Sequence, residues 1–339
     1  MVNDGRRDHR RAEVAVVTGA SAGIGRAIAQ EFGRHGAQVG LLARGVEGLE
    51  EARDEVEQAG GRAIVVPTDV ADHDAVEAAA LRVEEELGPI DVWINNAMTT
   101  IFAPFHRITP DDYRRATEVT YLGYVWGTMA ALRRMRPRNR GTIVQISSAL
   151  AYRAIPLQSP YCGAKHAIRG FTDSIRSELM HDGIDVQITA VNLPAVNTPQ
   201  FDWCKSTMPN RPQPVPPIFQ PEVIARAAWF AAHARRREVT VGWPALKAIW
   251  GNKFVPGFAD WYLAQIGYDS QQTTEPARPE RPSNLYEPVA GLHAAHGRFD
   301  DRARDWSAQN WLNMRRGAVA TAAIAGMAIA GLLTVRNGR

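Results

Sequence analysis

Short apolar stretches alternate along the chain with longer segments in which apolar residues recur every three or four positions. The short stretches have the composition of strands that are buried on both faces, and they cover residues 13–19, 37–44, 62–70, 90–97, 141–148 and 184–192. The longer segments have the spacing of amphipathic helices, and they cover residues 23–36, 46–60, 72–88, 111–135 and a helix around residue 161. This alternation predicts an α/β fold in which helices cover both faces of a parallel sheet.

The regular pattern ends near Gly242, and the composition then changes. We expect five parts: a disordered arm at 1–11, a regular catalytic domain at 12–242, an aromatic-rich extension at 243–269, a polar linker at 270–316 and an apolar helix at 317–335. Within the domain, residues 199–221 contain seven prolines and are expected to form a stiff, extended loop.

Charge and cysteine content exclude several classes of protein. The formal net charge of +3 over 339 residues is too small to indicate nucleic-acid binding. Arginine clusters at 133–140 and 235–237 have two interpretations, a solvated helix end or contact with an anionic membrane surface. With only Cys162 and Cys204, a disulfide framework is not expected, and a reducing compartment is favoured. The first residues have no apolar run and so do not resemble a secretory signal.

A glycine-rich turn, TGASAGIG at residues 18–25, lies between the first predicted strand and the first predicted helix. Gly19, Gly23 and Gly25 would let the backbone turn sharply and bring its N–H groups close to a pyrophosphate. The amino end of the helix would add the positive end of its dipole. The turn therefore predicts a dinucleotide site in a Rossmann-type, doubly wound sheet.

The residue after the second predicted strand bears on the choice of dinucleotide. A site for NAD would present an acidic side chain there to the ribose 2′-hydroxyl group. This chain has Ala43 and Arg44 instead, and a guanidinium can pair with a 2′-phosphate. NADP(H) is therefore favoured, and NAD(H) is less expected.

The stretch SPYCGAKHA places Tyr161 and Lys165 four positions apart, on one face of a helix. Alone, this spacing is typical of an exposed helix face. Together with TGASAGIG, NNA at 95–97, and Ser148 thirteen residues before the tyrosine, it resembles the short-chain dehydrogenase/reductase family in its compact form. The resemblance covers about residues 12–242 and implies a Rossmann-type sheet of about seven strands.

The resemblance implies a catalytic group made of Ser148, Tyr161, Lys165 and Thr120. Tyr161 would exchange a proton with the oxygen of an alcohol or carbonyl group, and Ser148 would hydrogen-bond that oxygen. Free tyrosine has a pKa of about 10, so a neighbouring ammonium and an oxidised nicotinamide would be needed to stabilise the phenolate. Lys165 would supply that ammonium and hold the nicotinamide ribose.

The resemblance also assigns cofactor contacts by position. They are Gly19, Ser21, Gly23, Ile24, Gly25, Arg44, Asp69, Val70, Asn95, Ala97, Tyr161, Lys165, Pro194, Val196 and Thr198. Asn95 has the second interpretation that it chiefly braces the sheet. No metal site is expected, because the pair His293 and His296 has no further ligands at suitable spacing.

Three departures from the family pattern concern the cofactor site and the proton relay. Met98 replaces the glycine of NNAG, Thr120 stands where the family has an asparagine, and Leu193–Pro194 replaces Pro–Gly. The asparagine helps to hold a water partly through its main-chain carbonyl, which a threonine also offers. These changes leave the Ser–Tyr–Lys chemistry in place.

Two roles are open for the aromatic side chains of residues 243–268. They could pack the extension against the core, or they could form an apolar wall for a lipophilic alcohol or ketone.

The end of the chain is unusual for the family. Residues 317–335 contain no charged side chain and are flanked by arginines. A helix of that length is about 28 Å long, close to the ~30 Å hydrocarbon core of a bilayer. Its many small residues also suit the alternative of a helix docked within an oligomer.

The sequence as a whole predicts an NADP(H)-dependent oxidoreductase that interconverts an alcohol and a carbonyl group on a small, hydrophobic substrate. We expect a cytoplasmic catalytic domain, membrane association through the C-terminal helix, and a homo-oligomer without nucleic acid. The alternative is a membrane-tethered, NADP-binding scaffold without catalysis, which the three departures from the family pattern suggest. The intact Ser148, Tyr161 and Lys165 argue against that alternative.

Overall fold

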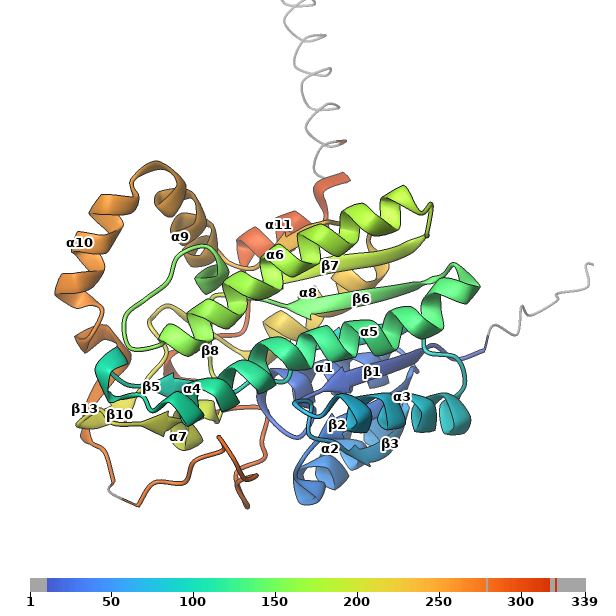
Figure 1. Cartoon of the computed structure of the whole chain (residues 1–339), viewed down its shortest axis with the longest axis horizontal. Helices are drawn as coiled ribbons and strands as arrows, with labels where there is room; N and C mark the ends of the chain where they lie inside the picture. The colour runs from blue at the N-terminus through green and yellow to red at the C-terminus, as the bar shows by residue number, and fades with distance from the viewer. Residues whose placement is uncertain (1–10, 279, 318–320, 322–339) are drawn as a thin grey trace, which may run out of the picture.

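The computed structural model describes residues 11–278, 280–317 and 321 (Figure 1). Its centre is one sheet of seven strands in the order β3-β2-β1-β4-β6-β7-β12, and all neighbouring strands run parallel. The strands are β1 (Val14–Thr18), β2 (Gln38–Ala43), β3 (Arg62–Pro67), β4 (Val92–Asn95), β6 (Gly141–Ile146), β7 (Val186–Asn192) and β12 (Glu238–Thr240). The predicted α/β fold with a doubly wound parallel sheet is confirmed.

Helices cover both faces of this sheet. One face packs on α1 (Gly23–Arg34), α2 (Val46–Gln58) and α8 (Pro221–His233), and the other packs on α3 (His73–Leu87), α5 (Gly123–Met135) and α6 (Ser159–His181). Successive residues of a strand point to opposite faces, so Ala15 and Val17 of β1 enter one core while Val14 and Val16 enter the other. This alternation explains why the strands are apolar throughout.

The long helix predicted at 111–135 is interrupted by one wider turn. α4 (Pro110–Thr117) continues through a π-helical turn at Glu118–Leu122 into α5. Such turns add a residue to the helix and are frequent at functional sites. Thr120 lies in this turn and is fully buried.

The proline-rich segment at 199–221 is built from short elements. They are α7 (Gln200–Trp203), β9 (Lys205–Ser206), β10 (Asn210–Pro212) and β11 (Ile218–Phe219). Strand β9 pairs with β5 (Ile101–Phe102), and β10 pairs with β13 (Gln272–Pro276). Strand β11 pairs with both β8 (Ala195–Val196) and β14 (Ala303–Arg304). The segment is therefore fixed on both sides by other parts of the chain.

The aromatic-rich extension forms two helices, α9 (Trp243–Phe254) and α10 (Pro256–Ile266), which project from the body at the upper left of Figure 1. Both roles considered for its aromatic side chains are wrong. None of these aromatic side chains lines the cavity that contains Tyr161. All of them are exposed and so do not pack on the core: Trp243, Trp250, Phe254, Phe258, Trp261, Tyr262 and Tyr268. The one buried residue of the two helices is Ala245.

Within the segment expected as a polar linker, residues 284–299 pack closely on the domain, and we call them the C-terminal strap. Leu285 is buried beside Ile101, and Phe299 is buried beside Phe201. Between these two points the backbone carbonyl of Ala294 accepts a hydrogen bond of 3.1 Å from the N–H of Gly23. The chain then reaches α11 (Ala308–Met314).

Most arginines of the two clusters make local contacts. Arg134 contacts Glu77 at 2.8 Å, Arg136 contacts Asp182 at 2.8 Å, and Arg235 contacts Asp185 at 2.7 Å. These pairs tie helix ends to neighbouring elements, which fits the first interpretation of the clusters.

The two ends of the chain are largely outside the described residues. The predicted disordered arm is described only from Arg11, whose side chain contacts Asp91 at 2.7 Å. Of the candidate transmembrane helix at 317–335, only Gly317 and Thr321 are described. No helix within the described part of the chain is long and apolar enough to cross a bilayer.

A buried polar cluster joins β4 to α5 and leaves room only for glycine at position 127. The indole N–H of Trp93 donates to Asn95 Oδ1 at 2.8 Å, and a Cβ on Gly127 would lie 2.1 Å from that same oxygen. Gly170 in α6 has no atom within 4 Å of a Cβ position.

Gly127→Ala should therefore lower the free energy of unfolding by about 2–4 kcal/mol, since it both overpacks the core and breaks buried hydrogen bonds. Gly170→Ala is the matched control and should raise stability by up to about 1 kcal/mol. Thermal and urea unfolding of the two variants measure the difference. Equal stability of both variants would contradict this account of position 127.

Candidate functional site

Two adjoining cavities lie at the carboxyl ends of the central strands. The first, of about 270 Å³, contains Tyr161, and we call it the Tyr161 cavity. The second, of about 170 Å³, is lined by the glycine-rich turn, and we call it the glycine-turn cavity. They share a wall made of Ile24, Asn96, Met98, Thr198 and Gln200. One elongated ligand could therefore extend from one cavity into the other.

The Tyr161 cavity contains three of the four predicted catalytic residues. Ser148 follows β6, while Tyr161 and Lys165 lie one turn apart on α6, and all three line the cavity. The Ser148 hydroxyl accepts a 3.0 Å hydrogen bond from the backbone N–H of Leu150, which fixes the side chain. Pro194, Val196 and Thr198 line the same space.

The Tyr161 side chain is half-buried and faces this cavity. Loss of bulk water around the phenol raises its pKa, and a hydrogen bond with Ser148 acts in the opposite direction. The pKa is thus raised in the protein alone, whereas the sequence argument required it to be lowered. The difference has a physical cause, because the positive nicotinamide invoked there is not a part of the chain.

Lys165 is the most unusual group in the site, since its side chain is only 1% exposed. Its ammonium donates to the hydroxyl oxygen of Tyr124 at 2.9 Å and to the carbonyl of Ile146 at 2.7 Å. It also lies 5.5 Å from the centre of the Tyr161 ring. Burial lowers the pKa of Lys165 to about 7. The amine can therefore gain or lose a proton near neutral pH.

Tyr124 is a member of the site that the sequence analysis missed. It is buried on α5, and its hydroxyl donates to the Ile146 carbonyl at 2.8 Å while it accepts from Lys165. Burial raises the pKa of Tyr124 well above its usual value, so the hydroxyl stays protonated. Its spacing of four residues from Thr120 on one helix was the signal available in the sequence.

The Thr120 side chain is bonded to the loop after β4, and the expected part of its main-chain carbonyl in the relay stays a prediction. Its hydroxyl donates to the Thr99 carbonyl at 2.8 Å and accepts from the Thr99 N–H at 3.0 Å. The side chain thus clamps the loop after β4 against the π-helical turn.

The glycine-turn cavity contains most of the predicted cofactor contacts. Its lining includes Gly19, Ser21, Gly23, Ile24, Arg44, Asp69, Val70, Ala97 and Thr198. Gly19 and Gly23 have positive φ values of 68° and 58°, and a Cβ on Gly23 would lie 3.3 Å from Thr198. Glycine at these two positions therefore permits the tight turn that forms part of the cavity wall.

Two predicted contacts, Gly25 and Asn95, line neither cavity. A Cβ on Gly25 would lie 2.1 Å from the Gly19 carbonyl oxygen, so this glycine permits α1 to pack on the turn. Asn95 is fully buried and bonds Gln145 at 3.0 Å and Thr128 at 3.1 Å. It braces the sheet, as its second interpretation suggested.

Arg44 lies between the glycine-turn cavity and the C-terminal strap. Its guanidinium donates to the backbone carbonyls of Asn284 and Tyr286 at 2.5 Å each. Burial lowers its pKa from the usual value, and the nearby carboxylate of Asp69 acts in the opposite direction. Asp69 itself pairs with Arg115 at 2.5 Å. A cluster of two guanidiniums and one carboxylate thus borders the cavity.

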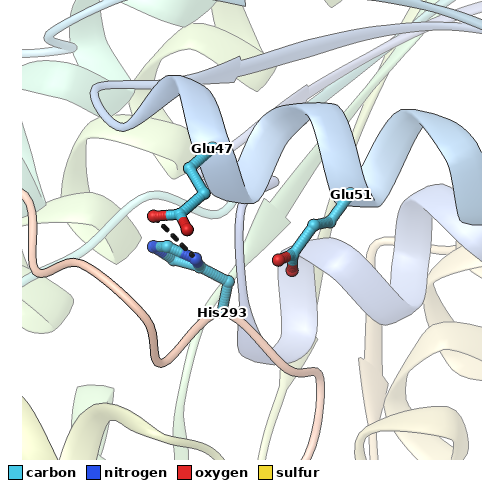
Figure 2. Close-up of side chains that lie close together, drawn as sticks. All are labelled: Glu47, Glu51 and His293. Atoms are coloured by element: carbon cyan, nitrogen blue, oxygen red, sulfur yellow. Dashed lines mark ion pairs between the residues drawn. The ribbon is translucent and has the colours of Figure 1, made fainter.

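The strap is further held by a group of acidic and imidazole side chains. Figure 2 shows Glu47 and Glu51, one turn apart on α2, facing His293, whose Nδ1 is 3.9 Å from Glu47 Oε2. It is the one group of three potential metal-binding side chains within the described ranges. Arg26 contacts Glu51 at 2.9 Å and already supplies positive charge there. We therefore interpret the group as an attachment of the strap to α2.

The wall of the Tyr161 cavity is mostly apolar. The proline-rich segment contributes Phe201 and Val215, and α9 contributes Pro244 and Ala245. Met98 lines both cavities and so lies at their boundary.

Comparison with known proteins accounts for this arrangement. Residues 13–207 match the model of the short chain dehydrogenase family. The chain belongs to the short chain dehydrogenases. As a member of this family, it is an oxidoreductase that acts on alcohol and carbonyl groups.

Individual members of the family are similar over much of the chain. An uncharacterized oxidoreductase of Bacillus subtilis, YxnA, is 32% identical over 83% of this chain and 80% of its own length. A 3-dehydrosphinganine reductase of Danio rerio is 32% identical over 62% of this chain and 65% of its own length. The crystal structure of an actinorhodin polyketide ketoreductase with NADPH has a TM-score of 0.60 and 28% identity, covering 68% of this chain and 95% of that one.

The hydrogen bond between Tyr124 and Lys165 can be tested directly, because the chain has only four lysines and NMR of 13C-labelled lysine can follow each one. Tyr124→Phe removes an acceptor of the ammonium, so the pKa of Lys165 should fall by about one to two units. Tyr121→Phe, on the same helical segment, is the control and should leave it unchanged. An unchanged or higher pKa in Tyr124→Phe would refute this role of Tyr124.

Proposed function

We propose that this short chain dehydrogenase uses NADP(H) to interconvert an alcohol and a carbonyl group on a lipophilic substrate. The observation that carries the proposal is the convergence of Ser148, Tyr161 and Lys165 on a largely apolar cavity beside the glycine turn. The Danio rerio relative is named a 3-dehydrosphinganine reductase and the similar crystal structure is that of a ketoreductase, and both names support this reaction.

Tyr161 would exchange the proton with the substrate oxygen. In the reducing direction a protonated phenol is required, and the raised pKa of Tyr161 keeps it protonated at neutral pH. Ser148 lies beside the phenol and would donate a hydrogen bond to the same oxygen as negative charge develops on it. When bound, the nicotinamide supplies or accepts the hydride.

In the direction of alcohol oxidation, Lys165 would stabilise the deprotonated form of Tyr161. An ammonium 5.5 Å from the phenol ring stabilises the phenolate that forms when Tyr161 gives up its proton. Tyr124 and Ile146 fix the position of the amine, because both accept hydrogen bonds from it. The Lys165 pKa of about 7 would let this ammonium change its charge during the proton transfer.

The residues of the glycine-turn cavity fit a dinucleotide. Gly19 and Gly23 line the cavity, and α1 begins at this turn, so its amino end would face the phosphates. Arg44 borders the same cavity and would pair with a 2′-phosphate, while no carboxylate occupies its position to receive a 2′-hydroxyl. The NADPH in the similar ketoreductase structure supports this choice over NAD(H).

We also propose a cytoplasmic location for the catalytic domain. The two cysteines are unpaired and buried, and burial raises the pKa of each thiol to about 11, which suits a reducing compartment. A membrane tether through residues 317–335 and a homo-oligomeric state rest on the sequence and on the family resemblance.

Tyr161→Phe tests the reaction itself. The variant keeps the ring but lacks the proton, so kcat should fall by at least about 100-fold while NADPH still binds. The measurement is nicotinamide absorbance during a screen of hydrophobic ketones and alcohols, with NADPH fluorescence for binding. Tyr113→Phe is the control, because this tyrosine of α4 donates to the Ser159 carbonyl at the start of α6 without lining the cavity. Equal activity of wild type and Tyr161→Phe would reject the mechanism.

Arg44→Asp tests the choice of cofactor. The carboxylate should repel a 2′-phosphate and accept from a 2′-hydroxyl, so the ratio of kcat/KM for NADPH over NADH should fall by about 100-fold or more. Arg114→Asp makes the same charge change at an exposed position and should leave the ratio unaltered. If the wild-type enzyme already prefers NADH, the argument from Arg44 fails.

A further inference from the structure

The helical pair α9–α10 exposes a large apolar surface, which we call the aromatic hairpin (residues 243–266). Phe254 is 71% exposed, and Phe258 and Trp261 are each 61% exposed. α10 contains no buried residue and one charged side chain, Asp260. A helix that is apolar around most of its circumference is normally covered by protein or lipid.

The aromatic hairpin is held in this exposed position by specific contacts. Asn252 donates to the Tyr152 carbonyl at 2.7 Å, and Asp260 pairs with Arg153 at 2.6 Å. In the short turn that follows α10, Gln271 donates to the Pro156 carbonyl at 2.9 Å. The hairpin is thus a fixed part of the fold, and the aromatic surface is presented outward.

The charges of the hairpin suit an anionic surface. Within the described residues, neither Lys247 nor Lys253 forms an ion pair, and Lys253 lies 5.4 Å from the ring of Trp250. The single carboxylate is neutralised by Arg153. Aromatic side chains combined with lysine are typical of helices that lie at the boundary between headgroups and acyl chains.

The place where the described chain ends gives a second, independent argument. The N–H of Gly242, at the start of α9, donates to Gln309 of α11 at 2.6 Å, so the two helices are joined. Trp243, Lys247 and Trp306 line one hollow between them. α11 ends at Met314, and uncharged residues follow from Gly317 in the sequence. The chain is thus described continuously up to Gly317, shortly after a helix that is joined to the base of the aromatic hairpin.

We propose that the aromatic hairpin docks on the surface of a lipid bilayer that contains anionic lipids, with its aromatic side chains at the depth of the headgroup boundary. A second copy of the chain fits the surface less well. A twofold interface would place one positively charged patch against another. The projecting shape of α9 and α10 in Figure 1 also suits insertion better than mutual packing.

Docking would bring the substrate cavity close to the lipid. Pro244 and Ala245 of α9 line the Tyr161 cavity, while Trp250 and Phe254 of the same helix belong to the exposed surface. Membrane docking does not depend on the proposed reaction, and its test requires no turnover.

The test uses the full-length chain and vesicles of phosphatidylcholine with phosphatidylglycerol. Phe258→Glu/Trp261→Glu should weaken binding in vesicle flotation at least tenfold. The control, Val46→Glu/Leu81→Glu, adds the same charge at positions 46% and 52% exposed on α2 and α3, and should bind within twofold of wild type. Equal binding of all three proteins would overturn the proposal.

A second measurement separates the hairpin from residues 317–335, which contain no tryptophan. Brominated lipids should quench the tryptophan fluorescence of the wild type, and Trp250→Phe/Trp261→Phe should lose most of that quenching while it stays folded. Flotation without hairpin quenching would assign binding to the C-terminal segment and overturn the proposal. A wild-type dimer that becomes monomeric in the glutamate variant, with no vesicle binding, would assign the surface to a second copy.

Discussion

The site depends on keeping one ammonium group out of water without a carboxylate beside it. Lys165 is buried, and its partners are the neutral oxygens of Tyr124 and Ile146. A buried charge of this kind is costly unless its hydrogen bonds are made, so the end of β6 and the starts of α5 and α6 must meet at one point. The position of the Tyr124 hydroxyl is therefore fixed as closely as the positions of the predicted catalytic side chains, although Tyr124 does not line the cavity.

The neighbouring polar cluster serves the same geometry from inside the sheet. Asn95 bonds Thr128 and Gln145, and Gly127 allows α5 to approach β4 closely. α5 is thereby set at the distance at which Tyr124 reaches both Lys165 and Ile146. The π-helical turn that precedes α5 places Thr120 against Thr99, so the loop after β4 is held to this turn.

The central fold could be predicted from the sequence because its strands are apolar throughout and its helices are amphipathic, so local pattern and tertiary burial agree. Motif spacing also placed Ser148, Tyr161 and Lys165, since one helical turn on α6 fixes the last two relative to each other. Tyr124 was missed although it follows Thr120 by four residues, because its role arises from contact between helices far apart in sequence. The strap and the aromatic hairpin were missed for the same reason. The composition of the strap is polar and rich in proline, and it does not reveal that Leu285 and Phe299 are buried. The composition of the hairpin is aromatic, and it does not reveal whether these side chains face the core or the solvent.

The strap has a consequence for the order in which the protein is made. It lies along the glycine-turn cavity, with Asn284 at Arg44 and Ala294 at Gly23, yet it follows every strand of the central sheet in the sequence. The sheet, the glycine turn and α6 therefore leave the ribosome before the strap does. Until the strap has been made, the glycine-turn cavity lacks the contacts that Asn284 and Ala294 supply in the finished protein.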